Sequence, residues 1–236
     1  MISKIIHQTA PRDETKWNPI WKECQSSWKK NFSEFEYIFW DDDDIRNLIK
    51  TDYPQYLKEY DSFKYHIIRI DFARSCILHK HGGIYADMDF YCYQNFYEFL
   101  LKNKIYLVES WPEWKEKVQN SLMISPPKQN FWIEYCDTII CNMKKINYDV
   151  KNYRDVLNYC GPICLSNLIT GQIRILPKEL FNPKIKNQFN WANNNYESID
   201  YHNALKEFKN LNSKNDIFTR HYLTGIWCDT NGMLRY

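Results

Sequence analysis

Two aspartates, Asp87 and Asp89, stand two residues apart directly after the apolar run Ile84–Ala86. The run predicts a short buried strand, and side chains at positions i and i+2 of extended backbone point to the same side. Two carboxylates held that close repel each other unless a cation or a proton neutralises them. Their oxygens suit a hard divalent ion such as Mg²⁺ or Mn²⁺, which also binds substrate phosphates. The spacing therefore predicts a metal site for a phosphate-bearing substrate.

The segment before this strand, residues 69–81, predicts a helix that carries a second pair of charged residues. Its apolar side chains recur at helical spacing, and Gly82-Gly83 can end it because glycine adopts left-handed backbone without a Cβ clash. Asp71 and Arg74 lie three residues apart, hence on one face of that helix. This pair places a carboxylate able to accept sugar hydroxyls beside a cation able to meet phosphate.

The ordered run resembles a known family. Asp71-x-x-Arg74, followed by Gly82-Gly83-Ile84-Tyr85-Ala86-Asp87-Met88-Asp89, is similar to the DXD-containing sugar-nucleotide region of glycosyltransferase family 32 and, more distantly, to the clostridial glucosylating toxins. The resemblance implies the α/β fold called GT-A, a single Rossmann-like domain with a mixed central sheet flanked by helices. The whole chain, 1–236, would form this domain, with 1–125 as the nucleotide-sugar and metal-binding half and 126–236 as the acceptor-side half.

The resemblance also implies a reaction. A sugar would move from a nucleotide-sugar, with a UDP-sugar favoured and a GDP-sugar possible, to a glycan, lipid-linked or protein acceptor, with retention at the anomeric carbon. Asp89, aided by Asp87, would bind Mn²⁺ or Mg²⁺ together with the two phosphates of the donor. Asp71 would hold sugar hydroxyls, while Arg74 and Tyr85 would orient the donor or its phosphate.

Other segments match the family's donor-binding pattern. The predicted strand at 4–8 carries an Ile-Ile-His-Gln motif that would approach the nucleotide. Residues 37–41 match a Tyr-x-x-Trp-Asp pattern that would lie near the base and the ribose. Two later segments, which begin at Asn120 and at Gly161, would approach the donor sugar. The resulting candidates for donor binding, besides Asp71, Arg74, Tyr85 and Asp87, are Ile6, His7, Gln8, Trp40, Asp41, Gly83, Asn120, Gly161, Pro162 and Trp227.

Structural explanations stay open for several of these residues. His7 and Asn120 could equally bond backbone groups at strand ends. Gly161-Pro162 is natural at the first turn of a helix without any ligand. The acidic run Asp41–Asp44 favours capping of the helix that follows it over metal binding.

The family commonly ends with His-His and then Ser-Trp, and residues 219–227 follow this pattern only in part. Tyr222 stands in place of the second histidine, which leaves His221 and Trp227. His221 could complete a metal shell with Asp87 and Asp89, or it could be a core histidine. Trp227 could cover the donor sugar or simply pack.

Composition excludes several classes of protein. The chain has 236 residues, of which 44% are hydrophobic and 17% aromatic, and this supports a folded domain rather than disorder. A net charge of +2 gives no case for a nucleic-acid binder. There is no apolar run of membrane-spanning length and no signal-peptide pattern, so we expect a soluble, cytoplasmic protein. The eight cysteines lack zinc-site spacing and are expected to be free thiols.

Two alternative functions use the same residues. A phosphohydrolase or phosphotransferase would use Asp87 as its nucleophile, but Tyr91 stands where a Thr or Val is expected in that class. A non-catalytic sugar-binding module would have no need to keep the carboxylates at Asp71, Asp87 and Asp89. The chain also lacks a P-loop and a dinucleotide fingerprint. The sequence therefore favours a metal-dependent glycosyltransferase.

Overall fold

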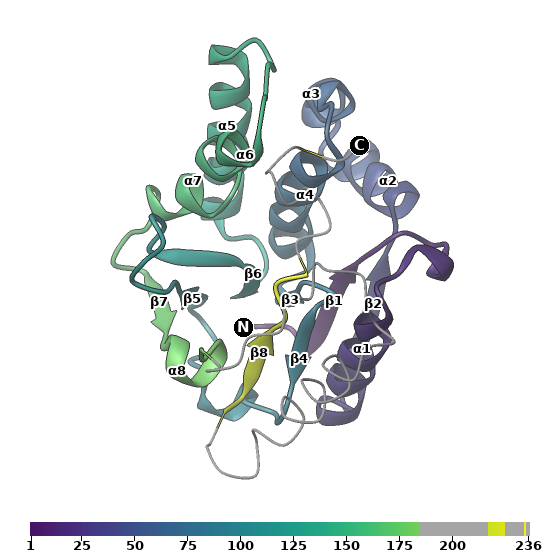
Figure 1. The fold of residues 1–236 in the computed structure, drawn as a ribbon, viewed down its shortest axis with the longest axis vertical. Coiled ribbons are helices and arrows are strands. Elements are labelled where there is room, and N and C mark those ends of the chain that lie inside the picture. Colours follow the sequence, from purple (N-terminus) through teal and green to yellow (C-terminus); the bar gives the residue numbers. More distant parts are fainter. Residues whose placement is uncertain (185–216, 225–233, 235–236) are drawn as a thin grey trace.

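A six-stranded mixed sheet with helices packed on both faces forms the centre of the molecule (Figure 1). The computed structural model describes residues 1–184, 217–224 and 234. In the order β2-β1-β3-β6-β5-β7, β1 is parallel to β2 and β3, β6 is antiparallel to β3 and β5, and β7 is parallel to β5. The strands are β1 (Ile5–Thr9), β2 (Glu36–Trp40), β3 (Gly83–Ala86), β5 (Ile105–Glu109), β6 (Val118–Ser125) and β7 (Ile173–Leu176). The expected mixed α/β architecture is confirmed.

A second, two-stranded sheet pairs β4 (Phe90–Cys92) antiparallel with β8 (Thr219–His221). The two strands come from distant parts of the sequence and lie side by side in Figure 1. β4 follows the Asp-x-Asp segment directly, so this pairing carries His221 back to that segment.

The helices are α1 (Pro19–Asn31), α2 (Asp42–Asp52), α3 (Leu57–Ser62), α4 (His66–His81), α5 (Asn130–Lys145), α6 (Tyr153–Tyr159), α7 (Pro162–Ser166) and α8 (Lys178–Phe181), with single 3₁₀ turns at Glu14–Lys16, Pro54–Tyr56 and Tyr97–Phe99. Side chains of β3 alternate between two cores because successive residues of a strand face opposite sides. Tyr85 belongs to the core under α2, α4 and α5, whereas Ile84 and Ala86 belong to the core that includes Trp28 of α1.

The turn from α4 into β3 fixes the direction in which Asp87 points. Gly82 ends α4 with φ +65°, its N–H bonding the carbonyl of Leu78 at 2.9 Å, and Gly83 follows with φ +93°. A Cβ on Gly83 would lie 2.5 Å from the carbonyl oxygen of Ile5 on the neighbouring strand. The expected helix end at the two glycines is confirmed, and close packing against β1 requires the second one.

Two elements differ from the sequence-based expectation. Both α6 and β8 were not expected, because the first is short and the second forms only through pairing with β4. The predicted cap of α2 is confirmed, since Asp41 and Asp44 form a reciprocal capping box.

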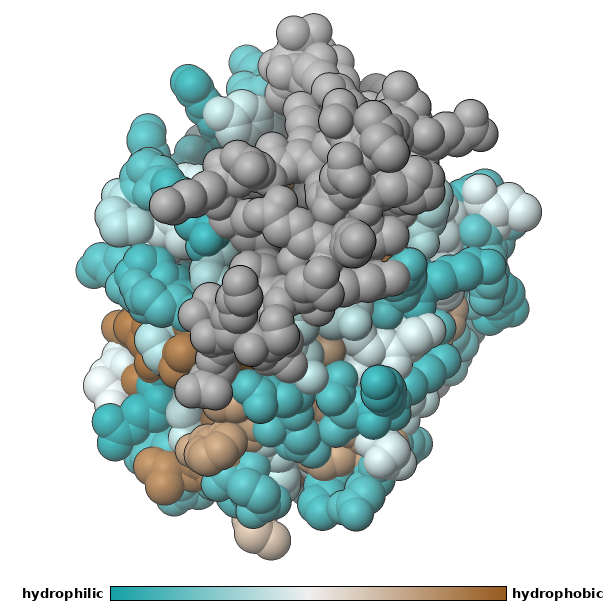
Figure 2. Space-filling model, turned by 60° about the horizontal axis from the view of Figure 1, so that its bottom comes forward, coloured by the Kyte–Doolittle hydropathy of each residue, from teal (hydrophilic) through white to brown (hydrophobic). Residues whose placement is uncertain are grey.

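The described surface is mainly hydrophilic, and Figure 2 shows hydrophobic side chains gathered toward the lower left of one face. Large hydrophobic side chains that are exposed within the described residues are Met1, Phe99, Leu101 and Ile175. All seven cysteines in the described ranges are free thiols, as expected for them. In the same ranges no helix combines the length and the apolar composition that crossing a bilayer requires.

Candidate functional site

Arg74 forms the centre of a buried charge cluster on the inner face of α4. Its Nη2 lies 3.1 Å from Oδ1 of Asp71, one helical turn earlier, and 3.5 Å from Oδ1 of Asp87 at the end of β3. Its Nη1 donates to the carbonyl oxygen of Asn120 at 2.5 Å, and its guanidinium lies over the ring of Tyr85. Burial opposes the charge on Arg74, but Asp87, Tyr85 and Asp71 outweigh this and raise its pKa. Arg74 is therefore a permanent cation held between two carboxylates at the wall of the cavity described below.

Asp87 is held from one side only. Its Oδ1 accepts a hydrogen bond from the Tyr85 hydroxyl at 2.9 Å, and that hydroxyl lies 3.0 Å from Oγ1 of Thr9. The side-chain amide of Gln8 donates to the backbone carbonyl of Asp87 at 3.1 Å. Oδ2 of Asp87 has no hydrogen-bond partner among the described residues, and a quarter of the side chain is exposed. One carboxylate oxygen thus stays available to a ligand.

Asp89 connects the Asp-x-Asp segment to the chain beyond β8. Its Oδ2 accepts hydrogen bonds from the backbone N–H and the hydroxyl of Thr224 at 2.9 and 2.7 Å. Its Oδ1 lies 2.9 Å from Nε2 of His221, whose ring stacks on Phe90. Burial raises the pKa of Asp89, but the contacts with His221 and Thr224 outweigh burial and lower that pKa to about 2. Asp89 is therefore a carboxylate at any physiological pH.

Together, Asp87, Asp89 and His221 form a three-residue group that could hold a metal ion. One ligand atom from each lies within 4.8 Å of the others. Burial raises the pKa of Asp87, and the negative charge of Asp89 raises it further, while Arg74 opposes the shift. A divalent cation would relieve this repulsion, and carboxylate oxygens with one imidazole suit Mn²⁺ or Mg²⁺. The donor set fits the ion predicted from the sequence.

Beside this group, Asp71 and Asn120 form a second polar pair. The Asn120 amide donates to Oδ1 of Asp71 at 3.0 Å, from β6 across to α4. Burial raises the pKa of Asp71 to about 7, the charge of Asp87 adding to the shift and Arg74 reducing it. A carboxyl that titrates near neutrality can accept or donate a hydrogen bond, as recognition of a sugar hydroxyl requires.

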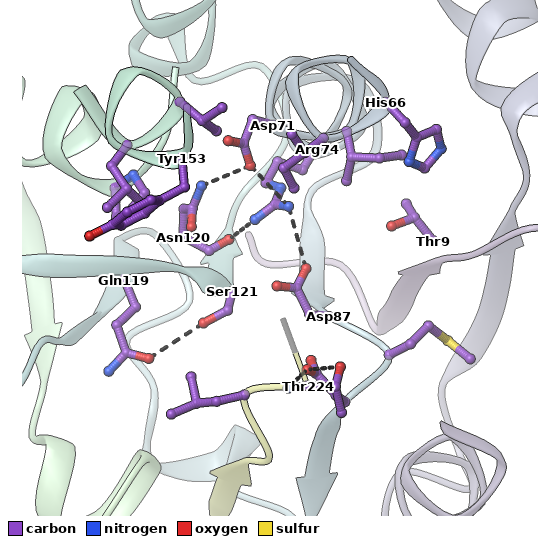
Figure 3. A pocket seen from close by; sticks show the side chains of 18 of the residues that line it. Thr9, His66, Asp71, Arg74, Asp87, Gln119, Asn120, Ser121, Tyr153 and Thr224 are labelled. Carbon is purple, nitrogen blue, oxygen red and sulfur yellow. Dashed lines mark hydrogen bonds and ion pairs between the residues drawn. The ribbon is translucent and has the colours of Figure 1, made fainter. Parts of the chain in front are cut away.

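These groups open into one cavity of about 1090 Å³. Figure 3 shows Asp87 in its middle, with Asn120, Gln119 and Tyr153 to one side and Thr9 and His66 to the other. Of the residues predicted from the sequence, Asp71, Arg74, Asp87, Asp89, Asn120, Pro162 and His221 line this cavity.

The other predicted donor-binding residues in the described chain lie behind the cavity wall. These are Ile6, His7, Gln8, Trp40, Asp41, Gly83, Tyr85 and Gly161. Trp40 donates its indole N–H to His7, both rings being buried, while Asp41 caps α2 and pairs with Arg12. Gly161 packs close to Asp71, where a Cβ would lie 3.5 Å from Oδ2. Trp227 lies outside the described residues.

Sequence reasoning missed several residues that line the cavity. Thr224 holds Asp89, Gln119 accepts a hydrogen bond from the buried amide of Asn182, and Tyr153 comes from the unexpected helix α6. Trp21, a buried residue of α1, also borders the cavity. Alternation along β6 offered the one local signal, since Gln119 and Ser121 lie two residues apart.

Comparison with known proteins points to one class. Residues 19–110 match the family described as a glycosyltransferase sugar-binding region containing a DXD motif. Over 184 residues the chain is 32% identical to inositol phosphoceramide mannosyltransferase 3 of Schizosaccharomyces pombe, covering 75% of this chain and 47% of that protein. Over 102 residues it is 42% identical to an uncharacterized glycosyltransferase of Acanthamoeba polyphaga mimivirus, covering 42% of this chain and 40% of the viral protein. The chain thus spans about half the length of the curated relatives it matches.

Solved structures show the same fold. The PaToxG glycosyltransferase superposes with a TM-score of 0.53 at 13% identity, covering 71% of this chain and 68% of that one. The glycosyltransferase GlyE of Streptococcus pneumoniae gives a TM-score of 0.53 at 12% identity, covering 94% of this chain and 55% of that one. At these identities the likeness concerns the fold alone, which is the GT-A arrangement.

Proposed function

Because the chain belongs to the family of glycosyltransferases with a DXD-containing sugar-binding region, we propose that it transfers a hexose from a nucleotide-sugar in a reaction that requires a divalent cation. The observation that carries this proposal is the convergence of Asp87, Asp89 and His221 in a cavity large enough for a nucleotide-sugar. Asp87 keeps one oxygen without a partner in the described chain, and Thr224 orients Asp89.

The residues around the cavity would have different roles in binding the cation and the donor. Asp87, Asp89 and His221 would hold Mn²⁺ or Mg²⁺, which supplies positive charge that stabilises the departing nucleoside diphosphate. Asp71 and Asn120 would bind hydroxyls of the transferred sugar. Arg74 lies between Asp71 and Asp87, and the Tyr85 hydroxyl donates to Asp87 Oδ1, so that Oδ2 would be the oxygen left for a cation. These residues would preorganise the donor before the glycosidic bond breaks.

The acceptor we propose carries a phosphate next to its accepting hydroxyl. The relatives from S. pombe and Saccharomyces cerevisiae are named as inositol phosphoceramide mannosyltransferases and as mannosyl phosphorylinositol ceramide synthases. The cavity of this chain is bordered by the basic side chains of Lys64, Arg69, Lys115 and Arg154. Mannose transfer to a phosphoinositol lipid is therefore the first reaction to test, with GDP- and UDP-sugars both offered as donors.

The experiment is a donor panel followed by turnover. Thermal shifts of UDP- and GDP-sugars with and without Mn²⁺ would identify the donor, because ligands that bind the native state raise its melting temperature. Release of nucleoside diphosphate should then need the cation and should fall at least ~100-fold in Asp87→Asn, since charge stabilisation in the transition state is lost. Asp149→Asn, at an exposed position, serves as control. Full turnover with chelator present, or in Asp87→Asn, would overturn the proposal.

We further propose that configuration at the anomeric carbon is retained, in line with the family resemblance of the Asp-x-Asp region. The anomeric proton coupling of the first-formed product, followed by NMR, reads this directly. A product with the opposite configuration to the donor would contradict it.

A further inference from the structure

Trp21 has a buried hydrogen-bond donor with no acceptor among the described residues. Its side chain is almost wholly enclosed (6% exposed), and its indole Nε1 makes no hydrogen bond there. The two other tryptophans nearest in sequence differ: Trp17 donates to the carbonyl of Pro11, and Trp28 to that of Phe90, both at 2.7 Å. Buried N–H groups without acceptors are rare, because they lose their hydration without replacement. Such a group next to a cavity suggests that a ligand provides the acceptor.

Trp21 belongs to the part of the cavity on the Thr9 side of Asp87. It shares an apolar cluster with Ala10, which follows Thr9, and with Met88, which lies between the two aspartates. Figure 3 shows Thr9 across Asp87 from Asn120 and Gln119. The cavity therefore has polar groups near Asn120 and, across Asp87, an apolar patch that Ala10, Met88 and Trp21 form on the side that also holds Thr9 and His66.

This division matches the two ends of a nucleotide-sugar. If the diphosphate lies at Asp87 and Asp89, the sugar and the nucleoside must extend to opposite sides. The polar side suits sugar hydroxyls, whereas the apolar side suits a flat base. The parallel strands β1 and β3 also end here, and ligands of α/β sheets bind beyond the carboxyl ends of such strands.

On the basis of the proposed function, we propose that the indole N–H of Trp21 donates a hydrogen bond to the nucleobase carbonyl at C4 of uracil or C6 of guanine, the position that carries an amino group in cytosine and adenine. A base with a keto group, as in uracil or guanine, satisfies this donor. A base with an amino group in the same place, as in cytosine, presents a second donor and leaves the indole unpaired. Sites built to pair a polar group reject analogues that cannot pair it. Trp21 thus determines selection of keto over amino bases.

The first test compares ligands and leaves the protein unchanged. Calorimetry with Mn²⁺ should show UDP binding about tenfold or more tightly than CDP, whose base carries an amino group in place of the C4 carbonyl and has an acceptor in place of the N3–H donor. If guanine nucleotides bind more tightly than uracil nucleotides, the two ligands to compare are GDP and 2-aminoadenosine diphosphate. Equal affinity within the pair would overturn the proposal, whatever the behaviour of any variant.

The second test uses Trp21→Phe, which keeps an aromatic ring and removes the N–H. The UDP-to-CDP affinity ratio should fall about tenfold, mainly through weaker UDP binding. Trp28→Phe removes an indole N–H from the same helix, away from the cavity, and should leave the ratio unchanged while lowering the melting temperature. An unchanged ratio in Trp21→Phe, or an equal loss for both nucleotides, would contradict the role of Trp21. If the wild-type protein binds no nucleotide at all, the proposed function itself is wrong.

Discussion

The indole N–H of Trp40 donates to Nδ1 of His7 over 3.1 Å. Nε2 of the same imidazole lies 2.9 Å from the carbonyl oxygen of Gly82, which can only accept, so Nε2 carries the proton. His7 is therefore a neutral imidazole with one defined tautomer, joining β1 and β2 to the glycine turn that precedes Asp87. His7 and Trp40, which the family pattern predicts near the nucleotide, thus help to fix the position of the strand that leads to Asp87 and Asp89.

This arrangement predicts acid sensitivity. Burial lowers the pKa of His7 from 6.5 to about 3, with the Gly82 hydrogen bond opposing and His81 adding to the shift. Between these values the unfolded chain binds a proton that the folded chain does not, so stability is full above pH 6.5 and falls as the pH drops toward 3. The slope from this residue is ~1.4 kcal/mol per pH unit.

Urea unfolding of wild type and His7→Gln at pH 7, 6, 5 and 4.5 isolates that contribution. The variant should be less stable than wild type at pH 7. Below pH 6.5 the difference in unfolding free energy between the two proteins should decrease by ~1.4 kcal/mol per pH unit, because only wild type loses stability through His7. Parallel curves for the two proteins would show that His7 is not the group that titrates.

Arg74 should be required for stability because it separates two buried carboxylates. Arg74→Met leaves Asp71 and Asp87 without their cation and should cost ~3–5 kcal/mol of unfolding free energy. Asp71→Asn should cost much less in the Arg74→Met background than in wild type, since it then removes an uncompensated charge. Denaturant unfolding of the four proteins of this cycle measures the coupling. If the losses of unfolding free energy from Arg74→Met and Asp71→Asn simply add, the two residues are not coupled.

The exposed pair of Arg46 and Asp61 provides a matched control for this cycle. It has two hydrogen bonds, at 2.8 and 2.7 Å, but it lies in solvent. Removing Arg46 should therefore have a much smaller effect than removing Arg74, because solvent screens exposed ion pairs.

Thr224 should affect cation binding without being a ligand. Thr224→Val removes the hydroxyl that donates to Asp89 Oδ2 and keeps the backbone N–H. Losing one hydrogen bond that orients a ligand typically lowers metal affinity about 10-fold or more. Titration of Mn²⁺, read by calorimetry or by its paramagnetic signal, tests this. The same exchange at Thr138, on the exposed face of α5, should change nothing. Wild-type affinity in Thr224→Val would exclude the role.

Gly83 should tolerate no side chain. Its φ of +93° is strained for any other residue, and a Cβ would meet the Ile5 carbonyl. Gly83→Ala should therefore cost ~2–4 kcal/mol and displace the end of β3. Gly171→Ala, where a Cβ meets nothing within 4 Å, should be almost neutral. Thermal unfolding compares them, and equal melting temperatures would show that β1 and β3 can separate without loss.

Local patterns were sufficient for the part of the site that comes from one continuous segment. Helical spacing brought Asp71 and Arg74 to one face, and the two glycines ended α4. These features depend on backbone geometry over a few residues, so the sequence predicts them directly. Asp87 and Asp89 also come together, but through a turn in which the Phe90 N–H bonds the carbonyl of Asp87 at 3.0 Å, and not along the extended backbone that the i, i+2 spacing predicted.

By itself, then, the sequence determined the α4-to-β3 unit and its carboxylates. The tertiary structure alone decided that β8 pairs with β4, which places His221 and Thr224 on Asp89, and that Trp40 and His7 pack behind the cavity. The strand pairing that brings His221 back to Asp89, 132 residues earlier in the sequence, depends on how the whole chain packs. An aromatic ring gives the same local pattern whether it lies in a core or beside a ligand.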